Sequence, residues 1–461
     1  AGALLSSSAH LPFLRELSAP QARLIAVVAM MAVWWFSEAL PMAATALIPA
    51  ASFPLLGIAP AGPTSQAYMS PIITLLLGGF LLALAVERCG VHRRLALHVL
   101  KWAGGSPRGL VFGFATAAAL LSMAISNTAT TLLMMPIALA LAGREEEGNR
   151  VTMAVLLATA YGASVGGMAT PVGTPPNLIA ISALERAFPE GPALTFLGWS
   201  ARALPAVALI LPGLALILTR VYPKVPKDLN LGAGETIRRE LAALGPWRPS
   251  EVRALALFGL AGVLWVTRPD LQIQEGLVLE GWASRLGLEG THDGTVAMLC
   301  VLFGFLLPDG DGGRILDGDS VSRAPWGLVL FFGGGVALSV GFAETGLSGA
   351  LGEALASMGL GWLAFVAVVC LSATVGTEMI SNTALANIAM PIIAATAPAL
   401  QVDPRLLLVP VAMACSCAFM MPVATGPNAI AFGTGRLRVP DMVRAGLPIN
   451  LMAWGVLVAH T

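Results

Sequence analysis

Charged residues are scarce in this sequence. Asp, Glu, Lys and Arg make up 11% of its 461 residues, whereas 56% are hydrophobic, and the mean hydropathy is +0.80. An ordinary soluble protein has about 25% charged residues and keeps most of them on its surface. So few charges cannot cover a particle of 47.5 kDa. The composition therefore excludes a soluble enzyme and a disordered chain, and most of the surface must face something other than water.

An excess of charge of one sign is also missing. The 26 Lys and Arg residues are balanced by 26 Asp and Glu residues, which argues against nucleic acid as a partner. The five cysteines are odd in number and scattered, so they predict no disulfide framework, and the five histidines form no metal-ligand set. The chain begins at Ala1 without a methionine, so we expect a missing or processed N-terminus.

Long apolar runs are abundant, and a membrane-crossing helix needs about 20 such residues. We expect full spans near residues 21–38, 40–58, 71–89, 151–186, 195–221, 252–268, 294–308, 326–345, 404–433 and 441–460. The runs at 151–186 and 404–433 are too long and contain central Gly and Pro clusters, which predicts broken helices. Two more runs, 107–143 and 361–399, have polar centres. Each is either two spans or a re-entrant hairpin, and the polar centres favour the hairpin.

The distribution of basic residues predicts the orientation. If both polar-centred runs are hairpins, 19 of the 26 Lys and Arg residues fall on one face and 7 on the other. By the positive-inside rule the charge-rich face is cytoplasmic, which places the C-terminus outside. If each hairpin were instead two full spans, every later segment would stay on the same side of the membrane. The charge count therefore predicts the orientation but not how deep the hairpins reach, which we infer from their polar tips. We expect a multi-pass protein of the inner, or plasma, membrane.

The chain contains an internal repeat. Three pairs of segments match in order: 122–129 with 377–384, 171–177 with 422–428, and glycines 78, 79 and 90 with glycines 334, 335 and 346. Their offsets are 255, 251 and 256 residues. Each predicted half has five full crossings, and because five is odd the second half is inverted relative to the first. Secondary transporters share this plan, and their sites lie near the midplane at interrupted helices.

The repeated segments carry polar groups that suit ions. Both hairpins contain a Ser-Asn-Thr triplet, at 126–128 and 381–383, whose hydroxyl and amide oxygens can coordinate a hard cation. The broken helices restart near the same depth, and their N-termini favour an anion. No Lys or Arg lies in either hairpin centre or either helix break. A dianion held there needs counter-charge, so we expect it to travel with cations.

These residues resemble the divalent anion/sodium symporter family, the INDY-like dicarboxylate transporters. The resemblance covers nearly the whole chain and includes the paired triplets, the Thr-x-Pro-Asn segments at 174–177 and 425–428, and residues 34–41. It implies that substrate carboxylates are bound by Ser126, Asn127, Thr128, Ser381, Asn382, Thr383, Thr425 and Gly426. It implies a first sodium site at Ser122, Ser126, Asn127 and Gly173, and a second at Thr377, Asn382 and Ala424.

The resulting prediction is an all-α integral membrane protein with two inverted five-span repeats, each with a re-entrant hairpin and a broken helix. The expected scaffold is 1–105 with 251–359, the transport domain is 106–222 with 360–461, and 223–250 is a cytoplasmic linker. The expected function is sodium-coupled secondary active transport of di- and tricarboxylates, above all a C4-dicarboxylate such as succinate, with Na⁺ as the coupling ion. The resemblance further implies a homodimer with an elevator-like movement, embedded in the lipid bilayer.

Several alternatives stay open at this point. The nearest are a sodium-independent dicarboxylate exchanger and a carrier for an inorganic anion such as sulfate. A channel could use the same midplane polarity, whereas an intramembrane hydrolase lacks a convincing nucleophile and base. The pattern Gly-x-Ser-x-Gly at 162–166 matches a nucleophile elbow, but it lies in a predicted helix without a nearby His. Glu378 is an intramembrane acid whose role is either a structural bond to nearby backbone or transport.

Overall fold

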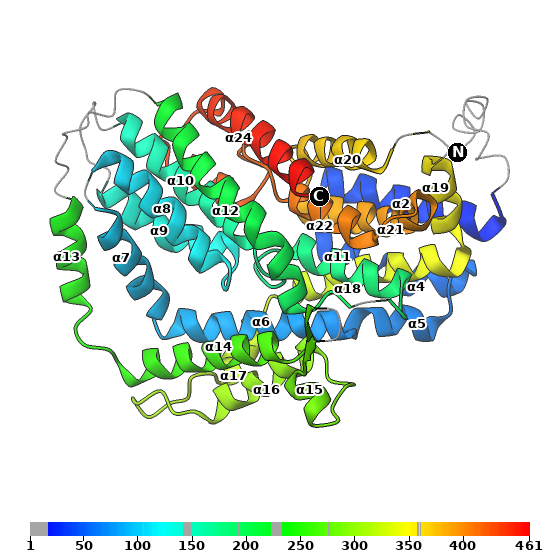
Figure 1. Cartoon of the computed structure of the whole chain (residues 1–461), viewed down its shortest axis with the longest axis horizontal. Coiled ribbons are helices and arrows are strands. Elements are labelled where there is room, and N and C mark those ends of the chain that lie inside the picture. The colour runs from blue at the N-terminus through cyan, green and yellow to red at the C-terminus, as the bar shows by residue number, and fades with distance from the viewer. Residues whose placement is uncertain are drawn as a thin grey trace.

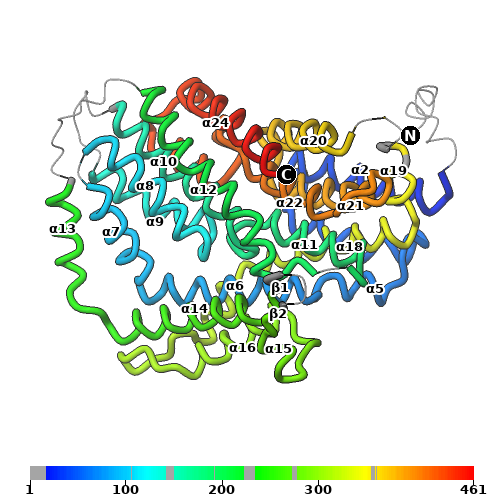
Figure 2. Tube along the Cα trace, in the orientation of Figure 1, coloured from blue at the N-terminus to red at the C-terminus, as the bar shows by residue number. Residues whose placement is uncertain are grey.

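The computed structural model describes residues 17–104, 106–141, 149–191, 193–222, 233–274, 277–356, 359 and 361–461. Within these ranges the protein is helical, and its only strands are β1 (Leu271–Gln274) and β2 (Leu277–Leu279). These two strands pair antiparallel, and Figure 2 shows the hairpin close to the short helix α15 (Trp282–Arg285). Four basic residues of the orientation count lie outside the described residues: Arg15, Arg144, Lys224 and Lys227.

In the part of the chain that the structure describes, seven helical stretches are long and apolar enough to cross a membrane. They are α2 (Ala19–Ser37), the run Ala61–Arg88, α12 (Phe196–Val221), α14 (Pro249–Thr267), α18 (Trp326–Thr345), α21 (Asn382–Leu400) and α24 (Val439–His460). Together with the near absence of strands, they confirm the predicted all-α membrane fold. The inverted orientation of the two halves remains a prediction.

The described elements of the first half follow the expected order. After α2 come α3 (Met42–Thr45), α4 (Ile48–Leu56), α5 (Ala61–Gln66), the 3₁₀ turn η3 (Ala67–Met69), α6 (Pro71–Arg88), α7 (Val91–Ala103), α8 (Pro107–Ser122), α9 (Asn127–Leu141), α10 (Asn149–Gly167), α11 (Pro175–Ala187) and α12. The expected single span at 40–58 is divided between α3 and α4, with Pro49 in the first turn of α4, a position that suits proline.

The second half contains the same sequence of motifs. After α13 (Ala233–Ala243) come α14, the β hairpin, α15, α16 (Asp293–Leu306), α17 (Gly318–Ser322), α18, α19 (Leu347–Ala356), α20 (Trp362–Gly376), α21, α22 (Pro404–Cys415), α23 (Gly426–Gly433) and α24. In each half a helical hairpin (α8–α9 and α20–α21) is followed by a broken helix (α10–α11 and α22–α23) and a long helix. The β hairpin was not expected from the sequence.

The two halves interlock. In Figure 1, α8, α9 and α10 group at one end of the molecule and α19, α20, α21 and α22 at the other, with the α5–α6 stretch running beneath both groups. The second segment of each broken helix crosses to the other half, because α11 packs on α21 and α22 while α23 packs on α9 and α10. Each hairpin is therefore held partly by the opposite repeat.

The Gly-x-Ser-x-Gly pattern on α10 has a packing role. A Cβ at Gly162 would lie 2.5 Å from the Ala115 carbonyl oxygen on α8, and a Cβ at Gly166 would overlap the Ala119 carbonyl oxygen. The Ser164 hydroxyl donates to Ala160 O within its own helix, at 3.3 Å. These residues let the α8 and α10 backbones approach closely, and the described residues give Ser164 no catalytic partner.

The matched glycines also have matched conformations. Gly90 ends the α6–α7 turn with φ of 76°, and Gly346 ends the α18–α19 turn with φ of 67°, a region that side chains rarely adopt. On α6, a Cβ at Gly79 would lie 2.9 Å from Val172, and on α18 a Cβ at Gly335 would overlap the Asn387 amide. The third repeat pair therefore marks where α6 and α18 approach the broken helix and the hairpin.

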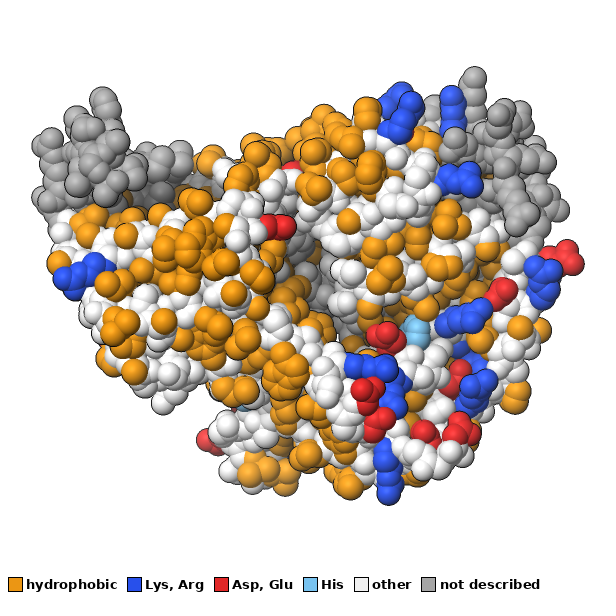
Figure 3. Space-filling view, turned by 180° about the vertical axis from the view of Figure 1, so that it is seen from behind, with side chains coloured by type: hydrophobic (Ala, Val, Ile, Leu, Met, Phe, Trp, Pro, Cys, Tyr) orange, Lys and Arg blue, Asp and Glu red, His pale blue; other side chains and the backbone are white. Residues whose placement is uncertain are grey.

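The outer surface fits a bilayer. Large apolar side chains are exposed on several helices, including Leu209, Val263 and Leu302. Figure 3 shows hydrophobic side chains over most of one face, with charged side chains gathered toward one side of it. These exposed apolar surfaces would be unfavourable in water and are typical of contact with lipid.

Candidate functional site

Each hairpin turns at a short non-helical tip. We call residues 122–128 the first tip and residues 377–383 the second tip. In the first, α8 ends at Ser122 and α9 begins at Asn127. In the second, α20 ends at Gly376 and α21 begins at Asn382, with Ser381 at its N-cap. Both tips therefore offer backbone N–H groups at a helix start.

Each broken helix is interrupted at matching positions. The first break is residues 168–174, between the end of α10 at Gly167 and the start of α11, and the second break is residues 416–425, between α22 and α23. Thr174 and Thr425 are the N-cap residues, and each is followed by proline in the first two helical positions. Proline is pre-organised for a helix start, so the sequence itself sets where each helix resumes.

The two tips and the two breaks meet at one cavity of about 340 Å³, which we call the central cavity. All eight predicted substrate residues line it: Ser126, Asn127, Thr128, Ser381, Asn382, Thr383, Thr425 and Gly426. Gly173 and Ala424 of the predicted sodium sites line it too, whereas Ser122 and Thr377 are fully buried behind it. The structure thus brings together the segments that the repeat singled out.

Four helix N-termini point their first residues at the central cavity. Asn127 starts α9, Pro175 starts α11, Asn382 starts α21 and Gly426 starts α23, and all four line the cavity wall. Helix N-termini carry partial positive charge, so together they favour an anion. At α11 this is the dipole alone, because Pro175 and Pro176 have no N–H to donate. Among the described residues that line this cavity, none is charged.

An asparagine in each half holds its broken helix in shape. The Asn177 amide donates to the carbonyls of Gly167 at 3.0 Å and Thr170 at 2.7 Å. The Asn428 amide donates to the matching carbonyls, Ala418 at 3.0 Å and Met421 at 2.9 Å. Carbonyls freed by a helix break need a donor in a membrane interior. The final Asn of each Thr-x-Pro-Asn segment therefore supplies the bonds that the interruption removes.

Oxygen atoms cluster around the first tip. The Ser122 hydroxyl lies 2.5 Å from Asn127 Oδ1. With the amide turned over, the Asn127 nitrogen instead donates to Ser122 Oγ at 2.5 Å, Ala163 O at 3.2 Å and Gly173 O at 3.3 Å. The amide fits because a Cβ at Gly167 would overlap it. Three of the four predicted residues of the first sodium site thus lie together, while Ser126 accepts from Ala129 N at the start of α9.

The second tip is similar but has fewer oxygens. The Thr377 hydroxyl lies 2.6 Å from Asn382 Oδ1 and 2.7 Å from the Cys415 carbonyl oxygen. Ala424 lines the central cavity, but no described contact joins it to the Thr377–Asn382 pair. The structure therefore assembles two of the three predicted residues of the second sodium site and adds a carbonyl, Cys415 O, that sequence reasoning did not include.

Glu378 holds the second break. Its carboxylate, only 4% exposed, accepts from the backbone N–H groups of Phe419 at 2.7 Å, Met420 at 2.9 Å and Met421 at 2.8 Å, and from the Asn450 amide at 2.7 Å. Of the two roles open from the sequence, the structure supplies the contacts of the structural one. Glu378 does not line the central cavity.

One wall of the cavity is apolar. Leu76 and Phe80 of α6 and Leu328 of α18 face the polar tips across it. On the other side the repeats touch each other, because a Cβ at Gly426 would overlap the Thr128 hydroxyl. A substrate here would contact polar groups from both hairpins and a smooth hydrophobic surface opposite them.

Sequence reasoning missed one cavity residue that the repeat could have found. Thr174 lines the central cavity and caps α11, as Thr425 caps α23. The two threonines are separated by 251 residues, the offset of their segment pair. Applying that offset to Thr425 would have identified Thr174.

A polar cavity among membrane-spanning helices, lined by helices that are interrupted there, defines a membrane transporter. Comparison with known proteins agrees with this class. The family model described as citrate transporter matches residues 32–418, and the chain belongs to this family. The predicted membership of the divalent anion/sodium symporter group is confirmed by this match and by the relatives described next.

Two curated relatives are called sodium-dependent dicarboxylate transporter SdcS. The Staphylococcus saprophyticus protein is 36% identical over 448 residues, covering 94% of this chain and 84% of the relative. The protein of Staphylococcus aureus strain NCTC 8325 is 35% identical over 450 residues, with the same coverage of 94% and 84%. The solved YdaH transporter of Alcanivorax borkumensis has a TM-score of 0.54 at 19% identity, covering 88% of this chain and 86% of that one, which supports the fold.

Proposed function

We propose that this protein transports a C4-type dicarboxylate such as succinate across the plasma membrane, coupled to sodium. The single observation that carries the proposal is the convergence of four helix N-termini and two Ser-Asn-Thr triplets on one uncharged cavity. The names of the two staphylococcal relatives support the same substrate class and coupling ion. The substrate carboxylates would bind the triplet side chains and the N-cap residue Thr425.

The electrostatics of the cavity favour cotransport. Each helix N-terminus stabilises an anion by about 0.3–2 kcal/mol. Removing a dianion from water costs much more than this unless it is paired. Because no described cavity residue carries positive charge, cations bound next to the substrate supply the missing counter-charge. Uptake then becomes coupled to the gradient of those cations.

The first tip offers the better cation site. A sodium ion prefers several oxygen ligands, and the cluster of Ser122 Oγ, Asn127 Oδ1 and the carbonyls of Ala163 and Gly173 meets that need without a fixed charge. In the orientation with Oδ1 toward these atoms, the Asn127 amide oxygen faces only other acceptor oxygens, which repel it. A cation bound between them would be coordinated by all of these oxygens and would remove the repulsion. Thr377, Asn382 and the Cys415 carbonyl form the corresponding second site.

The two sides of the central cavity support the proposed division into domains. The polar side of the central cavity comes from the proposed transport domain, 106–222 with 360–461, and the apolar side includes α6 and α18 of the proposed scaffold, 1–105 with 251–359. A smooth apolar wall beside a polar site allows one domain to slide past the other with its substrate enclosed. We propose such an elevator movement, a homodimer formed through the scaffold, and an outer C-terminus.

Succinate uptake in proteoliposomes tests this function. We expect uptake driven by an inward sodium gradient and its loss when choline replaces sodium. Citrate and sulfate are run in parallel, and we expect both to be transported less well than succinate. An undiminished rate in choline with internal succinate present would indicate the sodium-independent exchanger, and faster sulfate uptake would indicate the inorganic-anion carrier.

The site itself is tested by Asn127→Ala and Asn382→Ala. Each variant removes an amide that starts a helix at the cavity, so we expect uptake to be abolished while the protein keeps a monodisperse elution profile in detergent. Ser164→Ala is the matched control, because that hydroxyl only bonds Ala160 O within α10. Near-normal uptake by either asparagine variant would contradict the assigned site.

A further inference from the structure

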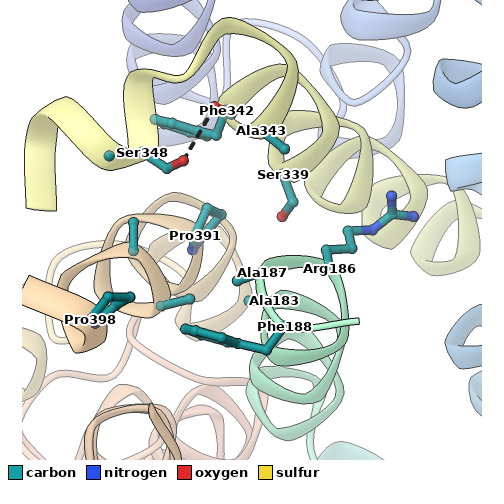
Figure 4. A pocket seen from close by; sticks show the side chains of 13 residues that line it. Ala183, Arg186, Ala187, Phe188, Ser339, Phe342, Ala343, Ser348, Pro391 and Pro398 are labelled. Atoms are coloured by element: carbon teal, nitrogen blue, oxygen red, sulfur yellow. Dashed lines mark hydrogen bonds between the residues drawn. The ribbon is translucent and has the colours of Figure 1, made fainter. Parts of the chain in front are cut away.

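A second cavity of about 340 Å³ lies between the ends of α11, α18 and α21 and the start of α19. We call it the distal cavity. Figure 4 shows its lining, with Phe188, Pro391 and Pro398 forming an apolar side and Arg186 leaving α11 near Ser339 of α18. Its walls thus combine residues of the proposed transport domain, on α11 and α21, with residues of the proposed scaffold, on α18 and α19.

The distal cavity continues the seam that holds the central cavity. Three helices line both, and each has one pair of lining positions eleven residues apart: Pro175 and Arg186 on α11, Leu328 and Ser339 on α18, and Thr383 and Ala394 on α21. Eleven helical residues span about 16 Å. The distal cavity therefore lies on the far side of the substrate residues from the α18 N-terminus.

A polar contact without hydrogen bonds separates the two cavities. Asn387 of α21 is fully buried, and among the described residues neither its amide nitrogen nor its amide oxygen has a hydrogen-bond partner. It packs directly on Gly335 of α18, where a Cβ would overlap it. Both residues lie between the two sets of lining positions. An unpaired buried amide is costly in a permanent seal, which suits a contact that opens.

Arg186 is the only charged residue among the described residues that line either cavity. It is half-buried, and no described carboxylate lies within 4 Å of its guanidinium. Its neighbour Glu185 is engaged elsewhere, with Oε1 at 3.4 Å from His292 Nε2. Arg186 therefore lines the distal cavity without a direct ion-pair partner within 4 Å, although the charge of the neighbouring Glu185 acts on it.

We propose that the distal cavity is an entry vestibule for the dianionic substrate and that Arg186 attracts the anion into it. The proposal rests on the proposed function and adds to it a site with a positively charged side chain, which the described lining of the central cavity lacks. Low-dielectric walls focus the field of a single charge and raise the local concentration of an oppositely charged ligand. Because Arg186 lies about 16 Å along α11 from Pro175 at the central cavity, it cannot contact a bound substrate, and we expect it to act on entry.

A labelling experiment tests the electrostatic part without transport. Ala343 of α18 lines the distal cavity and is exposed, so Ala343→Cys gives a thiol there. We expect it to react faster with a sulfonate-bearing methanethiosulfonate than the same thiol does in the Arg186→Gln background, by about tenfold, the low end for charged clefts. The trimethylammonium reagent should show the reverse. The protein without Ala343→Cys gives the labelling of the native cysteines.

Succinate uptake tests the role in entry. Arg186→Gln should raise KM by about tenfold with kcat retained. The difference should shrink as choline chloride is added at constant sodium, and Arg186→Lys should restore KM. The control is Arg202→Gln. Arg202 is a half-buried arginine that lines a separate cavity beside α22 and α24. An unchanged labelling ratio, or a changed ratio with unchanged KM, overturns the vestibule. Absence of uptake by the unmodified protein would instead contradict the proposed function.

Discussion

In the first half of the chain, the Thr170 hydroxyl of the first break donates to the Met123 carbonyl of the first tip, at 2.6 Å. In the second half, the second tip supplies the side chain, because Glu378 accepts from three backbone N–H groups of the second break. The positions correspond: Glu378 follows Met123 by 255 residues, and Met421 follows Thr170 by 251. The same two positions are therefore joined in both repeats by opposite chemistry.

This difference separates what the repeat preserves from what it leaves free. The contact between tip and break is preserved, together with the asparagine that bonds the freed carbonyls, Asn177 or Asn428. The atoms that make the contact differ between the halves: a hydroxyl and a carbonyl in the first, a carboxylate and backbone N–H groups in the second. A hydroxyl bonded to a carbonyl contributes about 1 kcal/mol net, whereas a buried carboxylate that satisfies four donors leaves all four unpaired when it is removed. The second half should be far more sensitive to a single substitution.

The largest expected effect is the loss of Glu378. Glu378→Ala leaves the N–H groups of Phe419, Met420 and Met421 and the Asn450 amide without their acceptor. Each unsatisfied buried donor costs about 1–3 kcal/mol, so we expect a loss of more than about 3 kcal/mol, seen as aggregation on size exclusion or a large fall in melting temperature in detergent.

The matched control for that substitution is Met123→Ala. The Met123 side chain is half-buried, and its tie to the break uses only the backbone carbonyl, so this variant should stay folded. Glu378→Gln should be intermediate, since its oxygen can replace Oε1 while its nitrogen faces the Met421 N–H. Equal stability of Glu378→Ala and Met123→Ala would remove the asymmetry between the halves.

The next effect concerns how closely the helices pack. Gly166→Ala places a methyl group against the Ala119 carbonyl of α8, which is backbone and cannot turn aside. Overpacking of this kind costs about 1–3 kcal/mol, and the shift would be passed to the first tip at the end of α8. The counterpart by the 251-residue offset is Cys417, which already has a Cβ. Cys417→Ala should lower the melting temperature much less, and the opposite ranking would refute close packing as the role of Gly166.

Much of this site could be predicted because its signals are local or repeated. The prolines that restart α11 and α23 and the two Ser-Asn-Thr triplets mark the breaks and tips in the sequence itself. The matched offsets also predicted that segments about 250 residues apart play the same role. Convergence on one cavity then follows, because polar groups in a membrane interior must meet one another or water.

Other features could not be predicted because they depend on three-dimensional contacts. Nothing near Glu378 in the sequence shows that its partners are the N–H groups of residues 419–421, and the carbonyls of Ala163 and Cys415 have no residue-type signal. The sequence argued against the Gly-x-Ser-x-Gly pattern as a nucleophile elbow, but its packing role could not be recognised without the position of α8. The β hairpin at 271–279 is too short for a periodicity signal.

A smaller effect is expected for the hydrogen bond that joins the first tip to the first break. Thr170→Val removes the one hydrogen bond to Met123 O and keeps the side-chain shape. We expect a loss of about 1 kcal/mol, seen as a modest fall in melting temperature with uptake retained. Comparison with Glu378→Ala on the same preparation gives the ratio between the two ties, and a loss as large as that of Glu378→Ala would show that the hydroxyl does more than join tip to break.

The smallest effect is expected at the end of α6, where an ion pair joins the two halves directly. Arg88 at the end of α6 lies 2.7 Å from Asp317 at the N-cap of α17, and the guanidinium holds the pKa of that carboxyl well below its usual range. A lowered carboxyl pKa stabilises the folded state above the unfolded value of about 3.9, and the contribution is lost as pH falls through the folded value. Asp317→Asn should therefore lower the melting temperature slightly and by a constant amount from pH 8 to 5, with the difference disappearing only below about pH 4.

The control is Asp319→Asn, because its partner Arg323 is 61% exposed and Asp319 is 63% exposed, and such pairs contribute little. A difference that already fades near pH 6 would mean that the Asp317 carboxyl is not held by Arg88, and that the contact between the halves at this face depends on other groups.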